Sequence, residues 1–130
     1  MTKALVIDDN RETADAINQM LGFLEVESYV AYGPRSALMI LKDLSPDILF
    51  LDISMPGVDG FEVMSYLRRS PQLHQVPIIV ITADSQPETA RKVQENGGLL
   101  TIVKPVTLEL LENTLREAGF WKTDEVIIGG

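Results

Sequence analysis

Short apolar runs with little polar interruption recur along the chain and predict five β-strands. The clearest lie at residues 4–7, 47–51, 76–81 and 99–103, and a weaker one lies at 26–31. Continuous apolar runs are typical of strands that are covered on both faces, as in parallel sheets. The pattern therefore predicts a parallel sheet buried between two layers.

The segments between these runs repeat apolar side chains at helical spacing, so that each segment has one apolar face. The positions expected to face inward are Ala14, Ile17, Leu21 and Leu24; Ala37, Leu38 and Leu41; Phe61, Met64 and Leu67; and Leu108, Leu111 and Leu115.

A fifth helix, from Ser85 to Asn96, is predicted to be largely exposed. Only Ala90 and Val93 are expected to point inward, and the other positions are mostly polar. Ser85 and Glu88 have the spacing of a capping box, and Gly97-Gly98 marks the end of the helix.

Five strands alternating with five helices predict an α/β fold with right-handed crossovers. A chain of 130 residues suits one domain. We expect that domain to span residues 1–121, followed by a C-terminal tail at 122–130. The apolar Val126-Ile127-Ile128 leaves open whether this tail packs against the domain.

Composition narrows the functional classes. The 19 acidic residues against 11 Lys and Arg give a net charge of −8, which argues against nucleic-acid binding by this chain itself. There is no cysteine, so disulfides and thiolate chemistry are excluded. No apolar run approaches the roughly 20 residues of a membrane span, and the N-terminus is too brief for a signal peptide. These features favour a cytoplasmic protein without a membrane partner.

Reactive side chains follow four of the predicted strands. Asp8-Asp9 follow the first run, Asp52 the third, Thr82 the fourth and Lys104-Pro105 the last. Ligands of doubly wound sheets bind outside the carboxyl ends of the strands. We therefore expect three carboxylates, a hydroxyl and an ammonium to converge on one edge.

Three neighbouring carboxylates repel one another unless a cation compensates their charge. Oxygen ligands without His or Cys suit Mg²⁺, which retains several waters and needs only two or three protein oxygens. We expect Asp9 and Asp52 to bind Mg²⁺ directly and Asp8 to hold a metal-bound water.

A carboxylate beside Mg²⁺ is also a candidate nucleophile for phosphoryl transfer, and here that carboxylate is Asp52. The transferred group spreads charge over three oxygens, so the reaction needs charge neutralisation and positioning. Lys104 and Thr82 could each serve one oxygen. The backbone N–H groups of Ser54 and Ala83 could complete the phosphate cradle.

These motifs resemble the receiver domains of response regulators in two-component signalling. The resemblance runs from Lys3 to about Gly119 and rests on Asp8-Asp9, the segment 52–60, Thr82-Ala83 and Lys104-Pro105. It implies a flavodoxin-like sheet of order 2-1-3-4-5. It also implies phosphorylation of Asp52 by a sensor histidine kinase or a histidine phosphotransfer protein, without turnover of an external substrate.

The same resemblance implies that the backbone carbonyl of Ser54 is a further Mg²⁺ ligand and that the Lys104-Pro105 bond is cis. Signalling in such domains couples the hydroxyl at the Thr82 position to an aromatic side chain three residues before the lysine. Here that position is Thr101, which is too small for this role. We expect the loop after Thr82, the exposed helix and the last strand and helix to rearrange instead. Dimerisation through the last two helices stays possible.

Thr101 keeps a second class open, a receiver-like interaction module that signals without phosphorylation. A flavodoxin-like electron carrier is disfavoured, because Asp8-Asp9 would repel the phosphate of a flavin.

Overall fold

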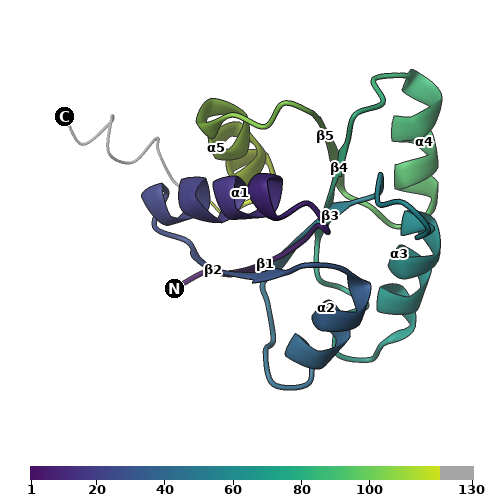
Figure 1. The fold of residues 1–130 in the computed structure, drawn as a ribbon, viewed down its shortest axis with the longest axis horizontal. Coiled ribbons are helices and arrows are strands. Elements are labelled where there is room, and N and C mark those ends of the chain that lie inside the picture. The colour runs from purple at the N-terminus through teal and green to yellow at the C-terminus, as the bar shows by residue number, and fades with distance from the viewer. Residues whose placement is uncertain (121–130) are drawn as a thin grey trace.

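Five strands alternate with five helices in the computed structural model, which describes residues 1–120 (Figure 1). The strands are β1 (Lys3–Ile7), β2 (Glu27–Ala31), β3 (Ile48–Asp52), β4 (Ile78–Thr82) and β5 (Leu100–Val103). The helices are α1 (Arg11–Phe23), α2 (Pro34–Ile40), α3 (Gly60–Arg69), α4 (Pro87–Glu95) and α5 (Leu108–Glu117). Trp121 and the tail predicted at 122–130 lie outside the described residues.

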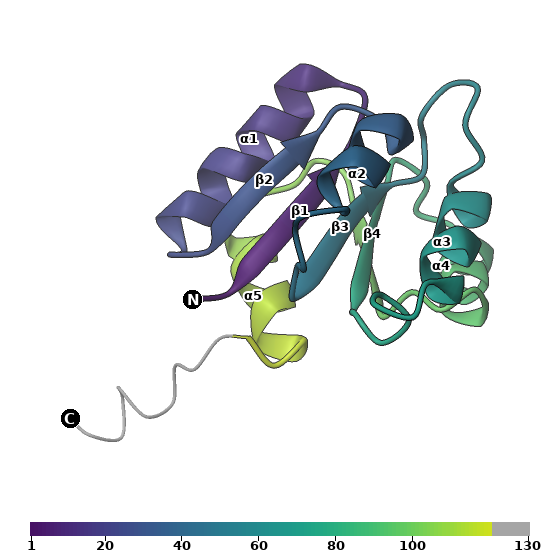
Figure 2. The same cartoon turned by 90° about the horizontal axis from the view of Figure 1, so that it is seen from below.

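The five strands form one parallel sheet in the order β2-β1-β3-β4-β5, which confirms the flavodoxin-like α/β fold (Figure 2). Central β1 pairs with β2 on one side and β3 on the other, so that Val6 lies between Val30 and Phe50. Parallel pairing brings the carboxyl ends of all five strands to the same edge. None of the helices within residues 1–120 has the length and apolar character needed to cross a bilayer.

Helices cover both faces of the sheet, with α1 and α5 on one side and α2, α3 and α4 on the other (Figure 1). Alternate strand residues serve the two cores. Val6 and Phe50 pack on the α1 and α5 side, whereas Leu5 and Leu51 pack on the other. All four are fully buried, which explains why the strands show no polar alternation. Phe120, just past α5, is partly buried and packs against the first core.

Helix α4 is exposed, as predicted, but it begins differently. The residue that caps it is Gln86, without a side-chain hydrogen bond, and Ser85 is not the cap. Asp84 instead accepts hydrogen bonds from the Gln86 N–H (2.9 Å) and the Thr89 hydroxyl (2.6 Å). The predicted capping box is therefore wrong, and Asp84, two residues beyond β4, supplies the side-chain contacts to the start of this helix in place of Ser85.

Three residues expected to point inward do not. Ala90 is exposed, and Val93 is the buried residue of α4. Leu38 of α2 is 40% exposed, since Ala37 and Leu41, one turn apart, face the sheet. Leu108 is 42% exposed because it is the first residue of α5, and the inward face begins one turn later.

The guanidinium of Arg68, near the end of α3, ties two loops to the body of the domain. It donates to the backbone carbonyls of His74 (2.9 Å), Val76 (2.7 Å) and Gly97. A side chain at Gly97 would meet Arg68, since a Cβ there would lie 2.8 Å from its Nε, and Gly97 also has a positive φ of 94°. Burial lowers the pKa of Arg68, although its donors are satisfied by carbonyls.

Candidate functional site

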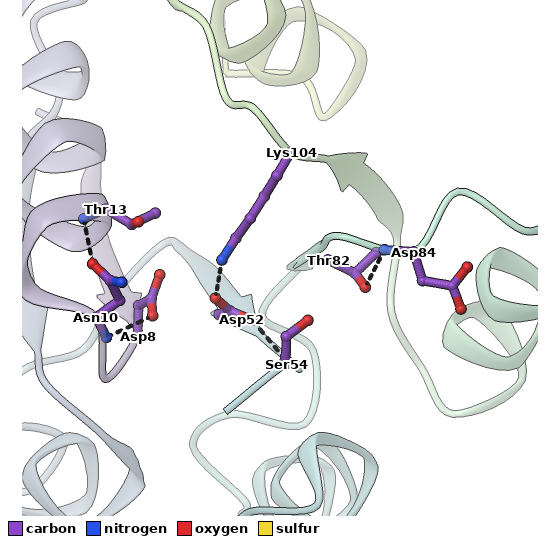
Figure 3. A network of polar contacts seen from close by, with 8 residues as sticks. All are labelled: Asp8, Asn10, Thr13, Asp52, Ser54, Thr82, Asp84 and Lys104. Carbon is purple, nitrogen blue, oxygen red and sulfur yellow. Dashed lines mark hydrogen bonds and ion pairs between the residues drawn. The ribbon is translucent and has the colours of Figure 1, made fainter. Parts of the chain in front are cut away.

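The carboxyl ends of β1, β3 and β4 carry three buried polar side chains, Asp8, Asp52 and Thr82. The segment after β5 adds Lys104, whose ammonium lies 2.7 Å from Oδ2 of Asp52 (Figure 3). Asp52 is almost completely buried, whereas the Lys104 side chain is 27% exposed. Of the three carboxylates, the hydroxyl and the ammonium predicted at this edge, the structure places Asp8, Asp52, Thr82 and Lys104 there.

The same turn follows three of the strands. A side-chain oxygen of the strand-end residue accepts a hydrogen bond from the backbone N–H two residues later. The pairs are Asp8 with Asn10 (2.9 Å), Asp52 with Ser54 (2.6 Å) and Thr82 with Asp84 (3.1 Å) (Figure 3). These turns fix the direction of each side chain before any ligand binds.

Asn10 was not among the predicted site residues. Asn10 donates its N–H to Asp8 and also caps α1 by accepting a hydrogen bond from the Thr13 N–H (3.0 Å). A signal for it exists in the sequence, because Asn directly before an amphipathic segment favours the N-cap position.

The loop after Asp52 brings Gly60, at its end, into close contact with Ile53, at its start. A Cβ placed on Gly60 would lie 2.5 Å from the Cβ of Ile53, so only glycine fits at this position. Asp59 caps α3 by accepting a hydrogen bond from the Phe61 N–H (2.9 Å). The loop that carries Ser54 is therefore fixed at both of its ends.

Asp8 has an uncompensated oxygen. Its Oδ1 accepts from Asn10, but its Oδ2 is buried without a hydrogen-bond partner among the described residues. Burial raises the pKa of Asp8 to about 6, and the negative charge of Asp52 adds to this effect, although the Asn10 N–H and Lys104 oppose it. A buried carboxylate oxygen without a donor is costly, and a cation beside it would remove that cost.

The donor chemistry of this pair fits Mg²⁺. Asp8 and Asp52 offer carboxylate oxygens only, and Mg²⁺ completes its shell with water when few protein ligands are present. Asp9 is exposed and makes no hydrogen bond or ion pair within residues 1–120. The described part of the chain contains no group of three acidic or histidine side chains arranged to hold a metal. Of the three carboxylates expected at this edge, Asp8 and Asp52 are buried there, and Asp9, next to Asp8 in the chain, is exposed.

The β5 side of the site is anchored through its backbone. The Lys104 N–H donates to the carbonyl of Thr82 (2.8 Å), and the Lys104-Pro105 peptide is cis, as the sequence resemblance implied. Ala83 is exposed beside Thr82. Thr101 lies half-buried on β5, paired with Val80 of β4.

Comparison with known proteins gives one family. The family model described as the response regulator receiver domain matches residues 4–116. A transcriptional regulatory protein, AfsQ1 of Streptomyces coelicolor, is 32% identical over 89% of this chain and 50% of its own length. A probable cyclic di-GMP phosphodiesterase of Vibrio cholerae is 30% identical over 84% of this chain and 24% of its own. The chain thus spans between about a quarter and a half of these curated relatives.

Solved structures agree over nearly the whole domain. The chemotaxis response regulator CheY4 of Vibrio cholerae has a TM-score of 0.83 at 28% identity, covering 90% of this chain and 98% of that one. The receiver domain of a DNA-binding response regulator from Colwellia psychrerythraea has a TM-score of 0.81 at 28% identity, covering 91% and 98%.

Proposed function

The chain belongs to the response regulator receiver domain family, a family of signalling domains, and on that premise we propose that Asp52 accepts a phosphoryl group. The donor is a phosphorylated histidine of a sensor kinase or a phosphotransfer protein. The observation that carries the proposal is the buried Asp52 carboxylate, ion-paired with Lys104 and adjacent to the unpartnered Oδ2 of Asp8.

In the transfer step, an Asp52 carboxylate oxygen attacks the phosphorus and forms a P–O bond. The P–N bond to the donor histidine breaks, and the imidazole nitrogen leaves with the electron pair. No external substrate is turned over, so the domain catalyses only its own phosphorylation and the hydrolysis that reverses it.

Asp9 and Asp52 would bind Mg²⁺ directly, the Ser54 carbonyl would be a further oxygen ligand, and Asp8 would hold a metal-bound water. Bound Mg²⁺ supplies charge neutralisation at one phosphoryl oxygen. The fit rests on the oxygen-only donors and on the buried, unpartnered Oδ2 of Asp8.

Groups that contact the unphosphorylated Asp52 carboxylate would bind the remaining phosphoryl oxygens. The Lys104 ammonium moves from Asp52 Oδ2 to a phosphoryl oxygen, and the Ser54 N–H does the same from Oδ1. The Thr82 oxygen accepts from Asp84, which leaves its O–H free to donate to the phosphoryl group, with the Ala83 N–H beside it.

The proposed output is a change at a protein-interaction surface on α4, β5 and α5. Rotation of Thr82 would release the Asp84 N–H, and Asp84 holds the start of α4 through Gln86 and Thr89. The signal therefore reaches α4 without an aromatic side chain at Thr101. In the phosphorylated protein, amide exchange should change in α4 and β5, and unchanged exchange there would contradict this route.

The test of phosphoryl acceptance is the intact mass after incubation with acetyl phosphate and Mg²⁺. The protein should gain one phosphoryl group, and Asp52→Asn should gain none. Asp43→Asn, a substitution at an exposed acid far from the strand ends, is the matched control and should behave as the parent.

A second candidate is a cytoplasmic interaction module that signals without phosphorylation. Thr101 supports this candidate, because it occupies the position where the usual coupling mechanism needs an aromatic side chain. It predicts no mass gain in the same assay and unaltered partner binding in Asp52→Asn. A parent protein that fails to gain mass while Mg²⁺ is bound would decide for this alternative.

A further inference from the structure

Few side chains hold helix α4 to the rest of the domain. Val93 is its one buried residue, and it packs in the core on the α2, α3 and α4 side. Asp84 holds the start of the helix through the Gln86 N–H and the Thr89 hydroxyl. A helix with so few anchors can shift at a small free-energy cost, so each remaining contact influences where it lies.

One further contact joins α4 to α3. The Lys92 ammonium lies 4.4 Å from the centre of the Phe61 ring, which belongs to the first turn of α3. The two helices lie side by side on the same face of the sheet (Figures 1 and 2). Phe61 is half-buried and packs against the same core as Val93. A cation over the face of an aromatic ring is attracted by the negative charge of that face.

Lys92 contacts this ring although two carboxylates lie near it along its own helix. Glu88 and Glu95 stand one turn before and one turn after Lys92, at spacings where ion pairs form on helices. Within residues 1–120, neither carboxylate is within ion-pair distance of the ammonium, and the ammonium makes no hydrogen bond. The Lys92 side chain is therefore directed across to α3.

The Phe61 ring is connected to the phosphoacceptor by a close backbone contact. Ile53, the residue after Asp52, lies so near Gly60 that a Cβ on Gly60 would be 2.5 Å from the Ile53 Cβ. Gly60 directly precedes Phe61, whose N–H donates to Asp59 (2.9 Å). Closely packed groups transmit displacement. A shift of the segment beside Asp52 would therefore move Gly60 and, with it, the Phe61 ring.

We propose that Phe61 couples the loop after Asp52 to α4 through its contact with Lys92, a coupling that rests on the proposed phosphorylation of Asp52. In the unphosphorylated protein the contact holds α4 in place. On phosphorylation the Ser54 N–H turns to a phosphoryl oxygen, the loop shifts, and the ring leaves the ammonium. Strand β5 carries no aromatic side chain, and Phe61 supplies one from the opposite side of α4.

The expected size of the effect follows from the contact. A contact transmits a signal only if it is made in one state and lost in the other. A cation–π contact at an exposed site shifts an equilibrium by about two- to fivefold. Amide exchange follows the opening equilibrium of a helix. Loss of the contact should therefore speed exchange at residues 90–95 by about that factor, in addition to any effect through Asp84.

The test is amide exchange of α4, measured by NMR before and after phosphorylation with excess acetyl phosphate and Mg²⁺. The intact mass of each sample reports the phosphoryl group. Lys92→Met removes the charge and keeps an unbranched apolar side chain. Before phosphorylation it should exchange about two- to fivefold faster than the parent, and afterwards at the same rate. Its ratio of the two rates should therefore be smaller than that of the parent by the same factor.

Matched variants identify the contact. Phe61→Leu removes the ring, keeps an apolar side chain in the core, and should behave as Lys92→Met does. Lys92→Arg restores a cation and should keep the ratio of the parent. Arg91→Met alters the neighbouring exposed cation of α4 and should also keep that ratio.

The coupling would be overturned if Lys92→Met exchanged faster than the parent by the same factor in both states. A contact that only stabilises the fold acts equally before and after phosphorylation, so it leaves the ratio unchanged. An unchanged ratio in Phe61→Leu would overturn the coupling as well. A parent that gains phosphoryl mass while these ratios stay equal contradicts the coupling alone. A parent that gains no mass contradicts the phosphorylation of Asp52 and the coupling together.

Discussion

Two polar clusters in this domain contain a cationic side chain. They differ in whether every buried polar atom has a hydrogen-bond or ion-pair partner. The guanidinium of Arg68 donates to backbone carbonyls of two loops, with no carboxylate involved. At the strand ends, the Lys104 ammonium pairs with buried Asp52, while Oδ2 of Asp8 stays buried without a donor. The first cluster is complete in the protein alone, and the second is not.

The difference separates structure from function. A fully satisfied buried cluster stabilises one arrangement of the chain, and a ligand can add little to it. A cluster with a buried unpartnered oxygen carries a free-energy cost, which binding of a cation or a phosphoryl group can offset. Substitutions at the two clusters should therefore separate loss of stability from loss of binding.

Arg68→Ala should have the largest effect on stability. It removes hydrogen bonds to at least three carbonyls, which should lower the free energy of unfolding by about 2–4 kcal/mol. Arg69→Ala is the matched control, since Arg69 contacts only Ser65 through its guanidinium within residues 1–120. Urea unfolding measures both. An Arg68→Ala protein as stable as Arg69→Ala would show that the carbonyl contacts contribute nothing.

Lys104→Met should destabilise less and act through Asp52. Losing the ammonium leaves the buried Asp52 carboxylate without its ion pair, which should lower the free energy of unfolding by about 1–3 kcal/mol at neutral pH. The loss is smaller than for a fully buried pair because the Lys104 side chain is partly exposed. Adding Asp52→Asn should recover most of that loss. A double-mutant cycle in urea unfolding measures the coupling, and strictly additive effects would contradict a direct ion pair.

Asp8→Asn should stabilise the metal-free protein. The pKa of Asp8 is about 6 in the folded state against 3.8 for the free side chain. The folded state therefore binds the proton more tightly, so the free energy of unfolding falls as the pH rises from about 4 to about 6 and then levels off.

Asparagine stays neutral, so Asp8→Asn should not lose stability in this way. Above pH 6 its free energy of unfolding should exceed that of the parent by about 1–2 kcal/mol, after allowance for solvent screening. Below pH 4 the two proteins should differ little. Thermal melts across this pH range check the sign. Asp9→Asn is the matched control, and an equal gain there would contradict a specific cost at Asp8.

Much of the fold follows from local patterns. The five apolar runs lie within two residues of the observed strands, because burial on both faces removes polar positions from each run. The inward faces of α2, α4 and α5 were less predictable. Whether Leu38, Ala90 or Leu108 is buried depends on how far each helix extends over the sheet, which spacing alone does not specify.

The candidate site was predictable in type but not in detail. Residue types at the strand ends identified Asp8, Asp52, Thr82 and Lys104, since parallel strands bring those ends together. The strand order came from family resemblance, because apolar runs carry no record of which strands are neighbours. Arg68 could not be found from its local sequence, as its carbonyl partners lie up to 29 residues away.

Calorimetric titration with Mg²⁺ tests the central claim most directly, using the parent protein, Asp8→Asn and the surface control Asp43→Asn. The parent and Asp43→Asn should bind Mg²⁺ at millimolar concentration, and Asp8→Asn should bind it at least about tenfold more weakly. Equal Mg²⁺ affinity in the parent and Asp8→Asn would contradict the assignment of the unpartnered Asp8 oxygen to a cation site.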